Sequence, residues 1–301
     1  MNVPVPPIFL NEDSYGKYSV IDGKQRLIAI NEFMEGRLIL KGLEVFSDIN
    51  GLSFDKLPSK LKQVLRTRPT VRSIIILRQS DSDVKYEVFQ RLNTGGVSLN
   101  PQEIRNSVYG GSLNDLIQKL SENDKFHKLL GVVKKESSSI YKAMRDAEFV
   151  LRFFTFKNRW QKISGSMKRL MDEFMHKNRN ASSKKLKELE REFLVTIEVV
   201  EKAFGKYSFK RWLPKYNRWR NQILASLYDA EMFACTRFSA EEVDGKQDYI
   251  VKQLKLLFED DSFRESIEVG TNAPVRFRKR ITNIIEMLSK IIGKTGFKKG
   301  L

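Results

Sequence analysis

Three polar side chains, Asp22, Gln25 and Arg26, lie close together where a strand pattern gives way to a helix pattern. Residues 18–21 form a β-rich apolar run, and Gly23 follows Asp22 before an amphipathic pattern begins. A helix N-terminus offers free backbone N–H groups and a positive dipole end, and the guanidinium of Arg26 matches phosphate oxygens. The pattern predicts a phosphate site. The alternative is an ordinary N-cap and turn with a surface arginine.

A second candidate site lies where a helical pattern over residues 82–93 ends in a glycine-rich segment. It carries Arg91 and Asn93, together with Gly95 and Gly96. Glycines allow close backbone approach to a ligand, and successive N–H groups in such a loop form an anion nest. The alternative is a glycine helix C-cap that needs no ligand.

The elements that must position these residues fall into two regions. Strand patterns occupy residues 8–10, 18–21, 38–46 and 71–77, and helix patterns occupy 24–35 and 57–67. A new helix is predicted from Asn100 as N-cap, Pro101 at the first position and Glu103 as capping-box partner. Helical patterns then cover 112–130, 143–157, 159–178, 183–205, 217–236, 239–260 and 275–292. The predicted class is α+β, with a small α/β core in residues 1–110 and a larger all-helical region in residues 111–301.

Basic and aromatic residues alternate over residues 209–220, and a second basic run covers residues 275–280. Aromatic rings stack on bases while arginine and lysine hold phosphates. The alternative is that these side chains snorkel from core helices. The candidate nucleic-acid-binding residues are Arg211, Trp212, Arg218, Arg220 and Arg278.

Other residue patterns indicate structure more than chemistry. Arg145, Glu148 and Arg152 share one helix face, as functional groups or as an ion-paired surface. The two histidines, His127 and His176, are expected on helix surfaces and are too few for a Cys/His zinc site. No GxxxxGK[ST] loop is present, which excludes an ordinary P-loop enzyme.

Composition favours a polyanion partner. The chain has 301 residues, of which 41% are hydrophobic, and a formal net charge of +17. Nucleic acid is the first expected partner, and a solubilising lysine-rich surface is the alternative. The single cysteine, Cys235, allows no internal disulfide and fits a reducing compartment. The sequence shows no signal peptide or membrane span, so a cytoplasmic protein is expected.

Three motifs in this order resemble the GmrSD-type restriction endonuclease N-terminal domain family, which is ParB/sulfiredoxin-like. They are residues 20–27, residues 89–100 with the nearby Glu103, Arg105 and Asn106, and residues 144–154. The resemblance implies a ParB-like α/β core, a role in phage defence or restriction of modified DNA, and nucleotide binding and hydrolysis through an Asp-Gly-x-Gln-Arg motif.

In this chain that motif is Asp22, Gly23, Gln25 and Arg26. On the resemblance, these four residues line a site for a nucleoside triphosphate and Mg²⁺. Arg26 would contact phosphate, Asp22 would hold Mg²⁺ or a water, and Gln25 would orient the water. Arg91 and Asn93, with Gly95 and Gly96, would form the second wall.

The chain departs from the family pattern at both ends. Family members carry a preceding segment of some tens of residues, and two-module members carry a C-terminal His-containing nuclease domain. DNA cleavage is therefore expected to need a nuclease partner, and a homo-oligomer is also possible. The rival functions are a non-catalytic DNA-binding module and a metal-dependent nuclease using Asp22 and Glu103.

Overall fold

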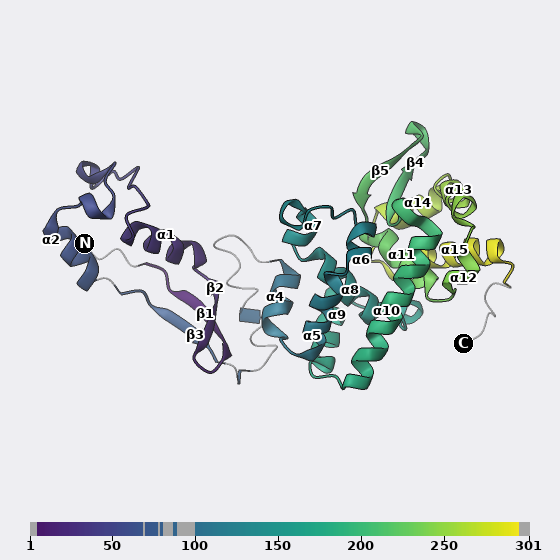
Figure 1. Cartoon of the computed structure of the whole chain (residues 1–301), viewed down its shortest axis with the longest axis horizontal. Helices are drawn as coiled ribbons and strands as arrows, with labels where there is room; N and C mark the ends of the chain where they lie inside the picture. The colour runs from purple at the N-terminus through teal and green to yellow at the C-terminus, as the bar shows by residue number, and fades with distance from the viewer. Residues whose placement is uncertain (1–4, 69, 78, 81–86, 89–99, 295–301) are drawn as a thin grey trace. The chain divides into compact units, whose positions relative to one another are not determined.

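The computed structural model describes residues 5–68, 70–77, 79–80, 87–88 and 100–294 (Figure 1). The chain divides into two compact units, residues 1–99 and residues 100–301. Arg91, Asn93, Gly95 and Gly96 lie outside the described residues. Among the described helices, none is both long and apolar enough to cross a lipid bilayer.

The first unit contains a small three-stranded sheet. Its strands are β1 (Ile8–Ser14), β2 (Lys17–Asp22) and β3 (Ser73–Ile76), and its helices are α1 (Lys24–Met34) and α2 (Ser59–Thr67). The strand order is β2-β1-β3, with β1 antiparallel to β2 and parallel to β3. The hairpin of β1 and β2 leads directly into α1, as the sequence predicts.

The core of the first unit is small. Its buried apolar side chains include Ile8, Phe54 and Leu57, and the ring of Phe33 meets Phe54 edge-on with centroids 5.7 Å apart. Helix α1 has no residue that is fully buried. Burial of apolar surface is the main source of stability in folded proteins, and this unit has few buried apolar contacts.

The prediction of a strand over residues 38–46 is wrong. The structure has a loop there, joined to residues 50–53 by a single bridge between Ile39 and Ser53. The Asn50 side chain holds the loop by exchanging two hydrogen bonds with the backbone of Leu43, each 2.9 Å long. Alternating apolar residues here reflect a folded-back loop, not a paired strand.

The second unit is mostly helical. Its helices are α4 (Pro101–Val108), α5 (Ser112–Ser121), α6 (Asp124–Leu129), α7 (Ser139–Lys142), α8 (Arg145–Phe156), α9 (Met167–Asn178), α10 (Ser183–Phe204), α11 (Ala225–Cys235), α12 (Ala240–Val243), α13 (Gln247–Leu257), α14 (Asp261–Glu268) and α15 (Pro274–Ile292). Helix α11 lies at the centre, because every residue from 226 to 235 is buried. It packs against α8, α10, α14 and α15.

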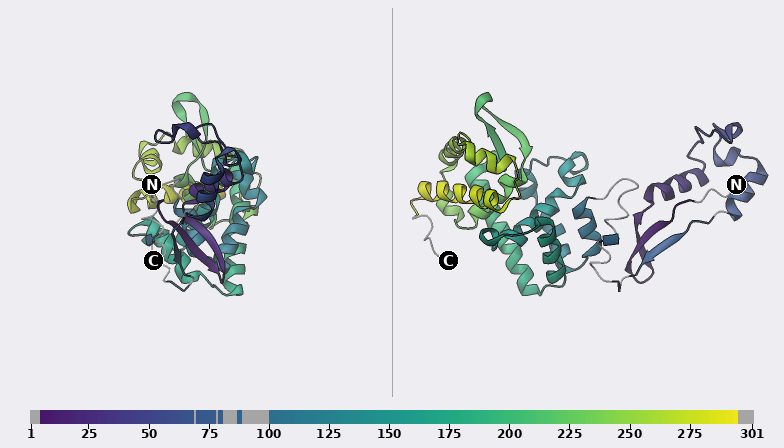
Figure 2. Two further views of the ribbon diagram at one scale, coloured as in Figure 1. Left: turned by 90° about the vertical axis from the view of Figure 1, so that its left-hand side faces the viewer. Right: turned by 180° about the vertical axis from the view of Figure 1, so that it is seen from behind.

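The second unit is not all-helical, which corrects the sequence prediction. Residues 217–224 do not begin a helix. Strand β4 (Lys210–Leu213) pairs with β5 (Arg218–Ile223) in an antiparallel hairpin that extends beyond the surrounding helices (Figures 1 and 2). Bulky aromatic residues such as Trp212 and Trp219 favour strands. They face each other across the pair.

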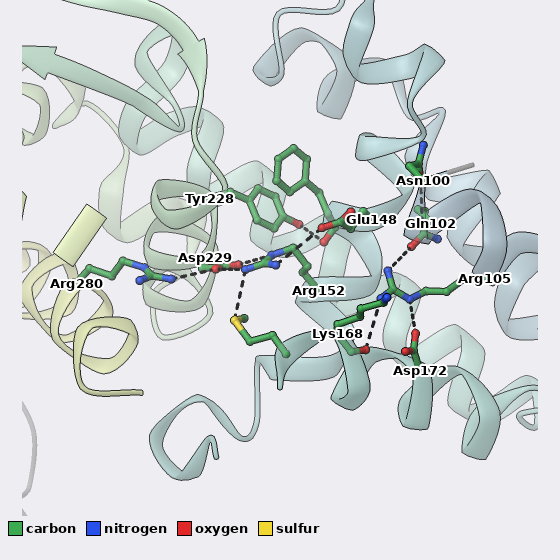
Figure 3. A network of polar contacts seen from close by, with 12 residues as sticks. Asn100, Gln102, Arg105, Glu148, Arg152, Lys168, Asp172, Tyr228, Asp229 and Arg280 are labelled. Carbon is green, nitrogen blue, oxygen red and sulfur yellow. Dashed lines mark hydrogen bonds and ion pairs between the residues drawn. The ribbon is translucent and has the colours of Figure 1, made fainter. Parts of the chain in front are cut away.

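A buried ion-pair network joins α8, α11 and α15 (Figure 3). Asp229 accepts hydrogen bonds from Arg152 Nε at 3.0 Å and Arg152 Nη2 at 2.5 Å, and from Arg280 Nη2 at 3.2 Å. Burial lowers the pKa of Arg280 to about 10. A second pair joins α4 to α9, with Arg105 Nε 2.6 Å from Asp172. These ion pairs hold α8 and α15 against α11, and α4 against α9.

Glu231 gives this unit a pH-dependent stability. It is fully buried, and burial raises its pKa well above the ordinary value of 4.5, although the Phe209 N–H donates to it at 2.8 Å. The folded chain keeps this proton where the unfolded chain has lost it. Unfolding then releases a proton, so this group lowers the free energy of unfolding as pH rises above about 4.5.

We therefore expect Glu231→Gln to become more stable relative to wild type between pH 5 and pH 8. Urea unfolding of both proteins at the two pH values measures this difference. A difference in free energy of unfolding that stays constant, or shrinks as pH rises, would show that Glu231 ionises normally in the folded chain.

Candidate functional site

The turn between β2 and α1 positions the first group of candidate residues. Gly23 has a φ of 94°, and a Cβ at this position would lie 2.6 Å from Cγ2 of Ile8. Only glycine fits such a left-handed conformation packed against a side chain. This packing places Asp22 at the end of the strand and Arg26 in the first turn of the helix.

The structure brings Asp22 and Arg26 together. Arg26 Nη2 pairs with the Asp22 carboxylate, and Arg26 Nη1 donates to the carbonyls of Pro6 at 2.7 Å and Pro7 at 3.1 Å. The side chains of Arg26 and Asp22 remain 30% and 24% exposed. The guanidinium thus ties the residues before β1 to α1 while part of it stays open to solvent.

Gln25 and the helix N-terminus face solvent. Gln25 is exposed, and no side chain caps α1 at its N-terminus. The first N–H groups of a helix have no partner within the helix, so they are left for water or a ligand. Among the described residues, no three His, Cys, Asp or Glu side chains gather closely enough to hold a metal ion.

The polar residues that follow the glycine-rich segment cap helix α4. Asn100 caps α4, accepting from the N–H groups of Gln102 at 2.9 Å and Glu103 at 3.1 Å. Glu103 completes the predicted capping box by accepting from the Asn100 N–H at 2.6 Å. The carboxylate that the nuclease alternative would use is therefore occupied by the helix terminus.

Aromatic rings anchor the β4–β5 hairpin to the second unit. Trp219 stacks on Tyr207 with centroids 4.8 Å apart and contacts Trp212 at 5.4 Å. Trp212 is 7% exposed, and the Lys255 ammonium lies 4.0 Å from its ring centroid. Trp212 is thus packed against its neighbours, and its role in nucleic-acid binding stays a prediction.

The predicted arginines occupy different environments. Arg218 and Arg220 are exposed on the same side of β5, because alternate residues of a strand share a face. Arg211 instead pairs with Glu268 of α14 at 2.5 Å. Arg278 is half-buried on α15, outside the hairpin. The hairpin therefore presents Arg218 and Arg220 to solvent, with the Arg218 guanidinium 5.7 Å from the Tyr216 ring centroid.

Two other predicted clusters turn out to be structural. Arg152 is buried and pairs with Asp229, and it lies 3.9 Å from Glu148, in agreement with the ion-paired alternative. Arg145 is exposed. His127 is buried, not on the surface, and its Nε2 lies 3.1 Å from Asp146. Asp229 was not among the predicted residues, although an acid within the apolar run 225–235 is a signal of a buried charge.

One comparison with known proteins gives a result. Residues 1–110 match the family model described as GmrSD restriction endonuclease, N-terminal domain. The match covers the first unit and helix α4. No curated protein and no solved structure matches the chain.

Proposed function

We propose that the protein acts in restriction or phage defence, because residues 1–110 match the family model of the GmrSD restriction endonuclease N-terminal domain. In this proposal it binds and hydrolyses a nucleoside triphosphate with Mg²⁺ at the turn between β2 and α1. Nucleotide binding is coupled to DNA binding by the second unit.

The observation that carries the nucleotide site is the uncapped N-terminus of α1 beside Asp22, Gln25 and Arg26. Unpartnered N–H groups and the helix dipole favour a phosphate at this position. Arg26 binds phosphate through the exposed part of its guanidinium, and the exposed Gln25 orients an attacking water. The three residues come from one turn of chain, so a single local structure positions them.

The donor set at this turn fits Mg²⁺. Magnesium in nucleotide sites is held by one or two carboxylates together with phosphates and waters. Asp22 supplies one carboxylate, which is paired with Arg26 in the structure. When bound, Mg²⁺ would neutralise phosphate charge, while the chain's own residues hold the nucleotide and the water.

Phosphate release from each of the four nucleoside triphosphates, with Mg²⁺ and with or without duplex DNA, tests this site. Asp22→Ala and Gln25→Ala should each lower release by a factor of about 10²–10⁴, the usual contribution of a positioned catalytic group. Glu44→Ala, which removes an exposed acid of the same unit, is the matched control. Wild type that releases no phosphate from any of the four would contradict the proposal.

A non-catalytic DNA-binding module is the second candidate, and the contacts of Arg26 favour it. Its guanidinium already bonds to Asp22, Pro6 and Pro7, which is the arrangement of a structural residue. In this case Arg26→Ala would unfold the first unit instead of removing nucleotide binding from a folded one. Circular dichroism and nucleotide binding, measured on the same sample, separate the two.

DNA binding rests on the exposed arginines of the hairpin. β-Ribbons enter DNA grooves, and each phosphate contact contributes about 0.9 to the slope of log affinity against log salt. We expect the double variant Arg218→Ala, Arg220→Ala to weaken duplex binding and to reduce this slope by about 2. Lys184→Ala replaces an exposed lysine of α10 and should change the duplex affinity and the salt slope much less. Equal losses in both variants would remove the hairpin from the interface.

A further inference from the structure

A cavity of about 440 Å³ lies in the second unit, between the segment before α7, the start of α8 and the base of the β4–β5 hairpin. Its volume is in the range of small-ligand sites. Lys134 and Arg145 bring cationic side chains to it from neighbouring parts of the chain, and Lys210 brings a third from a distant segment. Asn221 and Gln222 add side-chain amides from β5.

Among the described side chains that line this cavity, all the charged ones are cationic. Among the side chains that the structure describes, no Asp or Glu lines the cavity, and none of its three cations forms a described ion pair. Elsewhere in the unit, Arg105 and Arg211 each have a carboxylate partner. Like charges around one cavity repel each other, so the arrangement costs stability unless an anion binds.

Arg145 lies at the N-terminus of a helix, where a cation is unfavourable. It occupies the first position of α8, a twelve-residue helix whose N-terminus carries a positive partial charge. A cation there opposes the helix dipole, whereas an acid would favour it. The arginine and the helix end are both positive, while the acidic Asp146 and Glu148 of the same turn do not line the cavity.

Lys210 is the most enclosed of the three cations. It is half-buried, and burial, with a smaller contribution from Lys206, lowers its pKa from 10.5. A bound anion beside Lys210 would favour its charged form. Serine hydroxyls at residues 137–139 also line the cavity, although that of Ser137 already donates to the Lys134 carbonyl, and Ile140 and Ile223 form apolar parts of its wall.

We propose that this cavity is a phosphate-binding site that takes a ligand with two or more negative charges through Lys134, Arg145 and Lys210. The guanidinium fork and two ammonium groups suit a chain of phosphates better than a single carboxylate. The phosphates belong to a free nucleotide or to a DNA backbone that continues from the hairpin. This cavity is a separate site from the nucleotide site proposed at Asp22, and it shares no residue with that site.

Isothermal titration with pyrophosphate and tripolyphosphate, without Mg²⁺, tests the site. Wild type should bind, and the double variant Arg145→Gln, Lys210→Met should bind at least about tenfold more weakly, as expected for the loss of two charge-assisted contacts. Lys184→Met is the matched control, since it also removes an exposed charge. Because Arg145 and Lys210 lie in the second unit, a loss of binding in the double variant assigns the probe to this cavity and not to the turn beside Asp22.

Duplex DNA provides the second arm of the experiment. If the ligand is a DNA backbone, the double variant should reduce the salt dependence of DNA affinity by about 2 while Lys184→Met does not. Thermal unfolding should show that all the variants are folded. The proposal is overturned if the double variant changes neither polyphosphate nor DNA binding, or if Lys184→Met has the same effect.

Discussion

Replacing Asp229 with alanine should lower the free energy of unfolding of the second unit by about 3–5 kcal/mol, the cost of removing one partner from a buried ion pair. The carboxylate is fully buried and accepts from both Arg152 and Arg280, so its loss leaves two buried guanidinium groups without a counter-charge. Urea unfolding, followed by the fluorescence of the second unit, measures the loss.

Glu148→Gln is the control for this prediction. Glu148 is partly exposed and lies 3.9 Å from Arg152, so its contribution should be at most about 1 kcal/mol. A similar loss in both variants would mean that general charge balance, not the buried geometry of Asp229, stabilises the unit. A loss below 1 kcal/mol for Asp229→Ala would show that water reaches the two arginines.

Gly23→Ala should destabilise the first unit selectively. A left-handed φ of 94° costs a non-glycine residue about 1–2 kcal/mol, and the contact with Ile8 at 2.6 Å adds an overpacking cost of about 1–3 kcal/mol. Hydrogen exchange of β1, β2 and α1 is the appropriate measurement, because global unfolding would combine two units. The protection of α11 should not change.

Gly16→Ala separates the two contributions. Gly16 also has a left-handed φ, of 72°, but no described atom lies within 4 Å of its added Cβ. It should lose only the conformational part of the stability. If the two variants lose equal protection, Ile8 moves aside at no cost, and the close packing of the turn does not position Asp22 and Arg26.

Local signals predicted local structure well. The capping box at Asn100 and the turn at Gly23 each depend on a few neighbouring residues, and the structure confirms both. The hairpin at residues 210–223 was missed because helix and strand patterns are ambiguous in short apolar segments. There the pairing of Trp212 with Trp219 decides the structure.

Contacts between distant residues could not be predicted in this way. The partners of Arg26 at Pro6 and Pro7 lie about twenty residues away, and only the folded hairpin brings them together. The cavity near Lys210 likewise collects side chains from three separate segments. No spacing in the sequence encodes such a meeting, because it depends on how helices and strands pack.

The aromatic anchoring of the hairpin has an optical consequence. The chain has three tryptophans, and two of them, Trp212 and Trp219, pair across the hairpin beside Arg218 and Arg220. Indole emission responds to nearby charge and polarity, and Lys255 already sits over the Trp212 ring. The protein therefore carries a built-in fluorophore beside its proposed DNA contacts, so binding can be followed in unlabelled material.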